Sequence, residues 1–376
     1  MSETARPGPE HFLSLIRRQQ RGRLKVYLGF APGVGKTFEM LQEAHRLKRQ
    51  GVDVVAGIVE THDRPETASL LDGLGQVPRR RIEYRGVALE ELDTEALLTR
   101  RPEVVLVDEL AHSNAPGTRH AKRWQDVEEL LQAGIHVVTT MNVQHLESLY
   151  DLIEGFTGVK VKERVPDYVL HEADQIVNVD LPAEDLQERL RAGKVYPAER
   201  IERALSGFFQ GPNLSRLREL ALEEVACALD KQRRKKGEEA PGTASERVMV
   251  CLSSRGPDAP RLLRKGARLA DRLNAPWYAV YIRTPGERLE RVDAATQRRI
   301  ADALALAQQL GGVPQAYSGP TVAGAIASFV SEYGITHLVM GRSRRPWWRR
   351  WFGQSAIDQV MSTVPGADIL VIGSEA

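Results

Sequence analysis

The residues best suited to chemistry lie together at positions 33–37, Gly-Val-Gly-Lys-Thr. After a glycine-rich turn, a lysine and a hydroxyl at the start of a helix can hold phosphate groups and a Mg²⁺ ion. The usual pattern places a glycine at the position of Phe30, whereas the nearest glycine here is Gly29. An apolar strand pattern precedes the turn and a helical pattern follows it, so we expect Gly29 to permit the turn one residue earlier. The sequence therefore predicts a phosphate-binding loop, against the alternative of an ordinary glycine-rich turn.

Two carboxylates follow another apolar run, EVVLVDE at 103–109. Asp108 falls where phosphate-loop enzymes place the acidic residue that holds Mg²⁺, so we predict a Mg²⁺ site at Thr37 and Asp108. Glu109 is a candidate catalytic residue, because a glutamate at this place can orient an attacking water in hydrolytic members. The alternative for Asp108 by itself is an ordinary helix N-cap.

Further polar residues end the expected strands and could reach the same crevice, because ligands bind beyond the carboxyl ends of parallel strands. Those that end the second strand are Glu60, Thr61 and His62, and those that end the fourth are Thr140, Asn142 and Gln144. Loop residues that satisfy local backbone groups are the competing interpretation. His112 and His120 flank a Pro-Gly turn without companion ligands at metal spacing. We interpret these two as loop or partner-contact residues and not as zinc ligands.

The elements that must position these residues are short apolar runs alternating with amphipathic helices. The expected strands of the first region are 24–30, 53–61, 103–109 and 135–144, and the chain turns increasingly helical over 150–230. Continuous apolar strands separated by helices indicate a parallel sheet covered on both faces. With the phosphate-binding loop, this pattern predicts a P-loop NTPase-like α/β domain with a helical C-terminal part.

A second alternating pattern begins after a stretch rich in charge, glycine and proline, which we interpret as a linker. The chain is therefore expected to comprise an N-terminal arm at 1–22, the first α/β domain at 23–230, the linker at 231–246 and a second α/β domain at 247–376.

The composition excludes several classes of protein. The chain has 376 residues, 42% of them hydrophobic, and a net charge of +2, which argues against nucleic-acid binding as its main activity. Its two cysteines cannot form a disulfide framework and fit a reducing compartment. The polar N-terminus lacks the apolar centre of a signal peptide, and no apolar run approaches the roughly 18–20 residues that span a bilayer. We therefore expect a cytoplasmic region.

The first α/β region resembles a known family from about residue 24 to 230. The stretches GFAPGVGKT, VETHDRPET, VDELAHSNAPGTRHAKRWQDVEELLQAGIHVVTTMNVQHLESL and VPDYVLHEADQIVNVDLPAEDLQERLRAGKVY are similar to the N-terminal domain of the KdpD family. Members of this family are the sensor histidine kinases of the bacterial Kdp potassium-uptake system, and they share the displaced glycine. The resemblance implies ATP binding by Asp108 and by the loop residues Gly29, Ala31, Pro32, Gly33, Val34, Gly35, Lys36 and Thr37.

The region 247–376 resembles the universal stress protein-like domain that follows in KdpD proteins, which implies a doubly wound α/β fold. ATP-binding members of that superfamily have two close glycines and then a third followed by Ser or Thr. Gly341 matches the first glycine, but Arg344 stands where the second belongs. Gly353, with Ser355 near it, comes one residue early, so ATP binding by this domain is left open. Some KdpD proteins bind cyclic di-AMP here, and the serines of CLSSRG partly resemble those involved, which makes cyclic di-AMP a candidate ligand.

The same loop carries Trp347, Trp348 and Trp351 among several arginines, in GRSRRPWWRRWFGQS. Indoles at an interface and guanidinium groups on phosphates would suit an anionic membrane surface. The alternative is a solvated loop whose tryptophans pack back on the domain.

The leading hypothesis is an ATP-binding regulatory input region of a KdpD-type two-component potassium sensor. The resemblance implies as partners the remainder of a histidine kinase, or a separate kinase and response regulator of the Kdp system. It also implies that full-length members are anchored in the inner membrane, with this region cytoplasmic. The family's transmembrane helices and kinase core have no recognisable counterpart in the chain, which leaves open a piece of a longer protein or a naturally short form.

Two other hypotheses remain. The first is a slow ATPase or phosphotransferase that depends on Asp108 or Glu109, with Arg119 or Arg123 as a candidate arginine finger. The second is a nucleotide-independent scaffold that acts through protein or membrane contacts.

Overall fold

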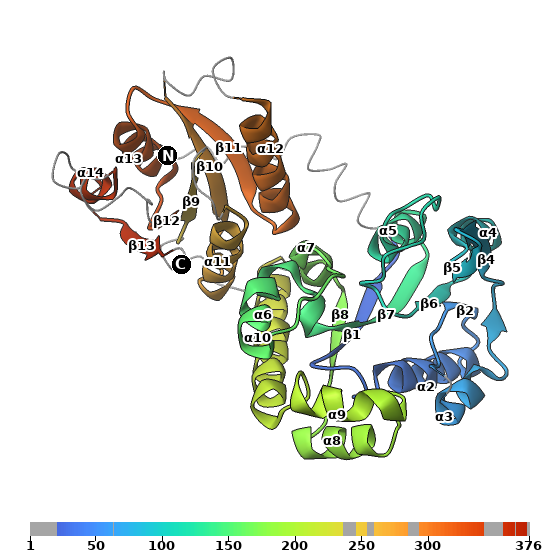
Figure 1. The fold of residues 1–376 in the computed structure, drawn as a ribbon. Coiled ribbons are helices and arrows are strands. Elements are labelled where there is room, and N and C mark those ends of the chain that lie inside the picture. Colours follow the sequence, from blue (N-terminus) through green and yellow to red (C-terminus); the bar gives the residue numbers. More distant parts are fainter. Residues whose placement is uncertain are drawn as a thin grey trace. The chain divides into compact units, whose positions relative to one another are not determined.

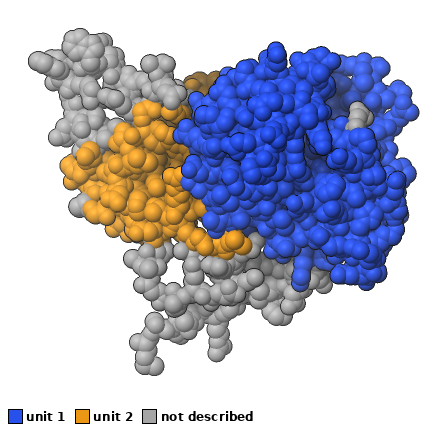
Figure 2. Space-filling model, turned by 90° about the horizontal axis from the view of Figure 1, so that it is seen from below, with its two compact units in different colours: residues 1–146, 152–165, 169–226 blue, residues 147–151, 166–168, 227–376 orange. Residues whose placement is uncertain are grey.

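The computed structural model describes residues 21–62, 64–235, 246–253, 259–284, 293–341, 356–364 and 366–373. Two compact units are present, shown in Figures 1 and 2. The first comprises the chain up to residue 146 with 152–165 and 169–226, and the second comprises 147–151, 166–168 and 227–376. Each unit has a parallel sheet of its own.

A six-stranded sheet with the order β3-β2-β6-β7-β1-β8 forms the centre of the first unit, and all its neighbouring strands are parallel. Its strands are β1 (Leu24–Gly29), β2 (Val54–Ile58), β3 (Gly75–Gln76), β6 (Val104–Val107), β7 (His136–Asn142) and β8 (Gln175–Val179). β1, β2 and β6 are buried along most of their length because they are apolar on both faces. The carboxyl ends of β1, β2, β6 and β7 therefore meet at one edge of the sheet.

Helices separate most of these strands, as the alternating sequence pattern predicts (Figure 1). The helices of this part of the chain are α2 (Lys36–Arg49), α3 (Pro65–Ala68), α4 (Thr94–Arg100), α5 (Arg123–Gln132), α6 (Tyr150–Thr157), α7 (Asp167–His171), α8 (Ala183–Arg191), α9 (Ala198–Ser206) and α10 (Gly211–Lys235). α2 buries Met40, Leu41 and Ala44 on one face, which fixes the helix that follows the glycine-rich loop.

The second unit has a five-stranded parallel sheet with the order β11-β10-β9-β12-β13. Its strands are β9 (Val248–Leu252), β10 (Trp277–Arg283), β11 (Val313–Ser318), β12 (His337–Gly341) and β13 (Asp368–Ile372), and its helices are α11 (Ala259–Arg272), α12 (Ala294–Gln309), α13 (Val322–Tyr333) and α14 (Ala356–Thr363).

Helices cover both faces of this second sheet. Side chains of α11 and α12 pack with Val248 and Val250, whereas those of α13 and α14 pack with Met249. Because successive strand residues point to opposite faces, the two helix pairs lie on opposite sides. The predicted doubly wound α/β fold is confirmed.

The sequence does not predict the two-residue edge strand β3, nor three larger β elements. β8 lies within the stretch 150–230 that the sequence marks as increasingly helical, yet it pairs with β1 at the edge of the sheet. An antiparallel hairpin of β4 (Arg80–Tyr84) and β5 (Val87–Glu91) and the edge strand β11 are the others. These strands carry mostly exposed or half-buried residues, so they lack the apolar run that marks a buried strand.

The predicted linker at 231–246 begins inside a helix, because α10 continues to Lys235, and residues 236–245 lie outside the described part of the chain. Of the predicted arm at 1–22, the structure describes only the last two residues. Within the described ranges, none of the helices is both long enough and apolar enough to cross a lipid bilayer.

Candidate functional site

Three glycines shape the loop between β1 and α2. Gly33 and Gly35 have φ angles of 90° and 111°, in the left-handed region that favours glycine. Gly29 ends β1 without such an angle, but a β-carbon there would lie 2.6 Å from a methyl group of Val34. Gly29 therefore lets the loop fold back closely over the strand end. Phe30, which replaces the usual glycine, is 1% exposed and belongs to the core.

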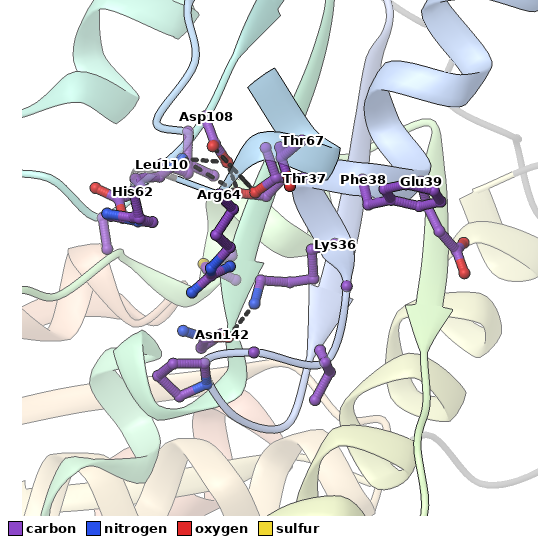
Figure 3. Close-up of a pocket in the computed structure, with 18 of the residues that line it drawn as sticks. Lys36, Thr37, Phe38, Glu39, His62, Arg64, Thr67, Asp108, Leu110 and Asn142 are labelled. Carbon is purple, nitrogen blue, oxygen red and sulfur yellow. Dashed lines mark hydrogen bonds and ion pairs between the residues drawn. The ribbon is translucent and has the colours of Figure 1, made fainter. Parts of the chain in front are cut away.

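Lys36 lies in the first turn of α2 and points toward the end of β7 (Figure 3). Its ammonium group donates hydrogen bonds to Oδ1 of Asn142 and, at 3.4 Å, to the carbonyl of Ala31. The pKa of Lys36 is lowered to about 8, chiefly by burial; the negative charge of Asp108 opposes the shift and the positive charge of Arg64 adds to it. A negatively charged ligand bound beside Lys36 would favour the charged form of this buried lysine.

Asp108 directly follows β6 and is buried, with 1% exposure. Its carboxylate accepts hydrogen bonds from the hydroxyl of Thr37 at 3.1 Å and from the hydroxyl of Thr140. The backbone N–H groups of Glu60 and Glu109 donate to it at 3.2 and 3.1 Å. Burial raises the pKa of Asp108, and the Thr140 hydroxyl opposes that shift. The two side chains of the predicted Mg²⁺ site, Thr37 and Asp108, are therefore adjacent.

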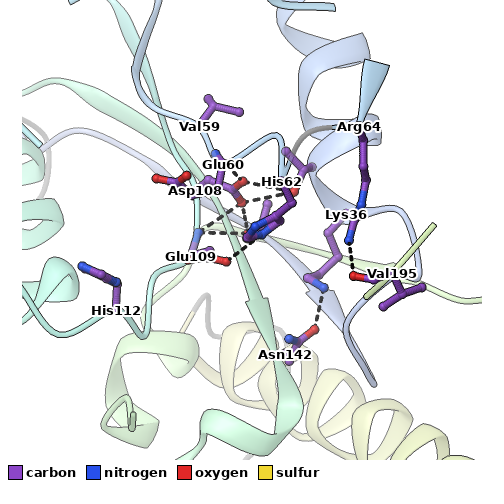
Figure 4. A network of polar contacts seen from close by, with 12 residues as sticks. Lys36, Val59, Glu60, His62, Arg64, Asp108, Glu109, His112, Asn142 and Val195 are labelled. Atoms are coloured by element: carbon purple, nitrogen blue, oxygen red, sulfur yellow. Dashed lines mark hydrogen bonds and ion pairs between the residues drawn. The ribbon is translucent and has the colours of Figure 1, made fainter. Parts of the chain in front are cut away.

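His62 and Glu109 face each other with unusual backbone angles. Their φ values of 49° and 54° lie in the left-handed region, which is strained for residues with a side chain. Nε2 of His62 lies 3.1 Å from Oε1 of Glu109 (Figure 4). This hydrogen bond raises the pKa of His62 and lowers the pKa of Glu109. The carboxylate of the candidate catalytic residue is thus engaged by the histidine.

These groups line one cavity of about 490 Å³. That volume is within the usual range for small-molecule sites. The predicted residues that line it are Pro32, Gly33, Val34, Gly35, Lys36, Thr37, His62, Asp108, Glu109, Thr140 and Asn142. Most of them come from the carboxyl ends of β1, β2, β6 and β7 or from the loops that follow, where the sequence places a ligand.

Comparison with known proteins gives the family of this chain. Residues 20–229, more than half of the chain, match the family described as the osmosensitive K⁺ channel histidine kinase sensor domain, KdpD. The chain belongs to the KdpD family. It is 45% identical over 376 residues to the sensor protein KdpD of Escherichia coli strain K12, covering 99% of this chain and 41% of that relative.

Two further KdpD relatives differ in how much of them the chain covers. The sensor protein KdpD of Mycobacterium tuberculosis strain H37Rv is 44% identical, over 94% of this chain and 41% of the relative. The putative sensor protein KdpD of Synechocystis sp. strain PCC 6803 is 43% identical, over 94% of this chain and 95% of the relative. The chain therefore spans about two fifths of the first two relatives and nearly all of the third.

The second unit matches a family of its own, the universal stress proteins, over residues 244–373. A solved universal stress protein in complex with cAMP aligns with 35% of this chain and 100% of its own, at 18% identity and a TM-score of 0.29. Another, from Archaeoglobus fulgidus, aligns with 34% and 98%, at 16% identity and a TM-score of 0.27. The family match and the strand order establish the predicted combination of a KdpD domain with a universal stress protein-like domain.

Of the residues predicted from the glycine-rich loop and the strand ends of this KdpD-family chain, five do not line the cavity. They are Gly29, Ala31, Glu60, Thr61 and Gln144. Glu60 approaches Asp108 with its backbone, while its carboxylate pairs with Arg79 at 3.1 Å. A position at a strand end therefore did not guarantee that the side chain reaches the cavity.

The loop histidines and the candidate arginine fingers form pairs of their own. His112 lines the cavity and lies 3.2 Å from Glu91, whereas His120 lies 2.9 Å from Glu129. Arg119 also pairs with Glu129, at 2.7 Å.

Arg123 is 1% exposed and donates a hydrogen bond to the backbone carbonyl of Asp108 at 3.0 Å. Neither Arg119 nor Arg123 lines the cavity, so the structure places neither of them where an arginine finger is needed.

Three cations line the cavity without having been singled out from the sequence: Arg64, Arg189 and Lys194. Arg64 lies in the polar loop after β2, so its strand-end position could have marked it. Arg189 belongs to α8 and Lys194 to the turn after it, far along the chain from the glycine-rich loop. No local pattern reveals that α8 lies against that loop.

Several predictions concern residues outside the described part of the chain. These are Trp347, Trp348 and Trp351 of the expected membrane contact, with Arg344, Gly353 and Ser355 of the glycine pattern. Gly341 ends β12. Of the stretch CLSSRG, the first two residues end β9 and the last three lie outside the described ranges.

Among the described residues, no group of three or more His, Cys, Asp or Glu side chains could hold a metal ion. Mg²⁺ in phosphate sites takes one or two protein ligands and completes its coordination with phosphate oxygens and water. Thr37 and Asp108 therefore fit Mg²⁺ together with a bound phosphate group, and not as a self-sufficient protein site.

Proposed function

We propose that the first unit binds ATP with Mg²⁺ and that this binding regulates a KdpD-type sensor of the two-component system for potassium uptake. The observation that carries the proposal is the geometry at the start of α2. Lys36 and Thr37 lie there in one cavity of about 490 Å³, with Asp108 3.1 Å from the Thr37 hydroxyl. Backbone N–H groups at a helix N-terminus, a lysine and a hydroxyl together suit the phosphates of a nucleotide.

In this proposal different residues of the cavity bind the phosphates and the Mg²⁺ ion. The backbone of residues 32–35 surrounds the phosphates, and Lys36 neutralises part of their charge. Thr37 and Asp108 would hold Mg²⁺, which supplies positive charge between phosphate oxygens. The lowered pKa of Lys36 agrees with this role, because the ammonium group has no carboxylate within ion-pair distance among the described residues.

Regulation fits the cavity better than rapid turnover does. The Glu109 carboxylate, the candidate base, is hydrogen-bonded to His62. Without a positioned base, hydrolysis of bound ATP is expected to be slow. Phosphate release in Mg²⁺-ATP over several hours, compared with buffer, measures this; release that depends on Glu109 would instead favour the ATPase hypothesis.

Calorimetric titration with Mg²⁺-ATP tests the binding itself. Lys36→Ala is expected to weaken binding on the order of a hundredfold or more, because it removes a buried cation from the phosphates. Lys48→Ala is the matched control, since Lys48 lies on the same helix, is exposed and does not line the cavity. An unchanged ATP affinity in the Lys36 variant would refute the proposal.

The proposed partners follow from the family. The chain spans 41% of the Escherichia coli relative. The residues described above therefore account for nucleotide binding and not for the kinase activity of a whole sensor protein. We propose that the occupancy of the cavity is passed to the remainder of a histidine kinase, or to a separate kinase and its response regulator. The loops around His62 and Glu109 are the candidates for the responding surface, since both line the cavity.

A further inference from the structure

Two arginines that line the cavity, Arg64 and Arg189, have backbone carbonyls as their hydrogen-bond partners. Nη2 of Arg64 donates to the backbone carbonyl of Val195 at 3.3 Å, and Nη1 of Arg189 donates to the carbonyl of Gly33 at 3.3 Å. Within the described part of the chain, neither guanidinium group has a carboxylate at ion-pair distance. By contrast, Arg100 forms a two-bond pair with Asp53, at 2.9 and 3.1 Å.

Arg64 is the more confined of the two. Its side chain is half-buried, and burial lowers its pKa. It is close enough to Lys36 to depress the pKa of that lysine (Figures 3 and 4). The nearby acids are already engaged, Asp108 by hydroxyl and backbone donors and Glu109 by His62. A guanidinium group has five N–H donors, so one bond to Val195 leaves donors for an anion.

The segment that Arg64 contacts also contacts the glycine-rich loop. A β-carbon on Gly33 would lie 2.5 Å from a methyl group of Val195 and 3.2 Å from one of Leu186, so both side chains pack directly on the backbone of this glycine. Val195 is 8% exposed, and Arg189 of α8 bonds to the same glycine. The segment 183–196 therefore covers the glycine-rich loop at Gly33, and the Arg64–Val195 hydrogen bond links this cover to the loop that follows β2.

We propose that Arg64 binds the terminal phosphate of a nucleoside triphosphate and, through its hydrogen bond to Val195, holds the segment 183–196 against the glycine-rich loop. The inference rests on the proposed function and adds a discriminating residue and a responding element to it. A diphosphate occupies the loop and Lys36 but offers no third phosphate to Arg64. The triphosphate therefore fastens the segment, and the diphosphate leaves it held by the protein contacts alone.

Titration with ATP and with ADP, each with Mg²⁺, tests the discrimination. The whole chain is compared with Arg64→Met, which keeps the apolar length and removes the charge. We expect Arg64→Met to weaken ATP binding about tenfold or more and to change ADP binding by less than about twofold. Arg100→Met is the matched control, because Arg100 is exposed and lies outside the cavity lining. An equal loss for both nucleotides, or no loss, overturns the inference.

Hydrogen–deuterium exchange over residues 183–196 tests the cover. ATP is expected to slow exchange there more than ADP does, and Arg64→Met to abolish that difference. Arg64→Lys, which keeps one charge but cannot bridge two acceptors in the same way, should retain much of the ATP affinity and lose the extra protection. It also serves if the methionine variant fails to fold. Equal protection by both nucleotides in the unaltered chain contradicts the proposal.

The two levels of proposal fail in different ways. If the unaltered chain binds neither nucleotide, both the proposed function and the role of Arg64 are wrong. If it binds ATP in a Lys36-dependent manner but Arg64→Met keeps the same ratio of ATP to ADP affinity, only the role of Arg64 is wrong.

Discussion

The two sheets of this molecule bury different kinds of side chain. In the first unit, Asp108, Thr139 and Thr140 are buried where β6 and β7 end, each with 2% exposure or less. In the second unit, the buried side chains of β9, β10 and β12 that the structure describes are all apolar or aromatic. Both sheets are parallel and covered by helices, so the architecture alone does not make a site. Polar groups at the strand ends, set around a glycine-rich loop, distinguish the first unit.

The largest loss of nucleotide binding in the first unit is expected from a side chain placed at Gly29, where the glycine-rich loop packs most closely on the end of β1. In Gly29→Ala the added methyl group would lie 2.6 Å from Val34 and 2.9 Å from the Lys36 stem, so the loop cannot keep its shape. We expect Mg²⁺-ATP binding to weaken on the order of a hundredfold, by titration, because displacing Lys36 costs a charged contact. Gly155→Ala is the control, since its β-carbon would meet nothing within 4 Å. Equal affinity of the two variants would contradict this account of the loop.

Changing the pH probes the same lysine without a mutation. Phosphates favour the charged form, and the pKa of Lys36 is about 8, so affinity should be flat below pH 8 and fall above it. Between pH 7 and pH 9 the loss is expected to be about tenfold.

The stability of the nucleotide-free protein should move the other way over the same pH range. The pKa of Lys36 in the folded protein, about 8, lies below the ordinary lysine value of 10.5, so burial of the charged lysine weakens folding at low pH. This penalty is relieved as the pH rises from about 8 toward 10.5. Calorimetry and urea unfolding at matched pH values measure the two opposite trends. An affinity that rises with pH would contradict this assignment.

A smaller effect is expected from the buried hydroxyls at the end of β7. Thr140→Val removes a donor from Asp108, which should weaken Mg²⁺-ATP binding severalfold and destabilise the fold by about 1–2 kcal/mol. Thr139→Val removes a bond to the carbonyl of Val107 instead, so it should cost about 1 kcal/mol and leave binding unchanged. Titration and urea unfolding of both variants decide the matter: a binding loss common to both would mean that burial, and not Asp108, is responsible.

The mildest effect on nucleotide binding is expected from the second unit. A β-carbon at Gly266 of α11 would lie 2.2 Å from a methyl group of Val250 on β9. Gly266→Ala should therefore destabilise this unit by about 1–3 kcal/mol through overpacking. We expect no change in ATP affinity, measured by titration beside the unfolding curve. A clear loss of affinity would show that the apolar sheet contributes to the site after all.

Much of the fold could be predicted from the sequence because its signals are local. Apolar runs mark β1, β2, β6 and β7, and the motif at 33–37 marks the loop even though Phe30 replaces a glycine. Exposed and half-buried edge strands such as β8 and β11 could not be predicted in this way, because one sheet neighbour suffices to hold them.

The site could be predicted in part for the same reason. Lys36, Thr37 and Asp108 belong to recognisable patterns, and the structure brings them together in the cavity. Arg189 could not be found, because its position depends on how α8 packs against Gly33. His62 and Glu60 stand two residues apart, yet only His62 lines the cavity, since its left-handed backbone turns the chain at that point. Such a turn is not visible in residue types.

The place of β1 in the sheet has a consequence for how the protein is made. β1 is the first strand of the described chain, but it pairs with β7 and β8, which end at Asn142 and Val179. The loop that follows β1 is covered only when Val195 reaches Gly33. On a ribosome, the glycine-rich loop therefore emerges long before anything can shape it. The apolar strand β1 stays without its partners β7 and β8 through most of the synthesis of the first unit. During that interval its unpaired backbone can take part in aggregation.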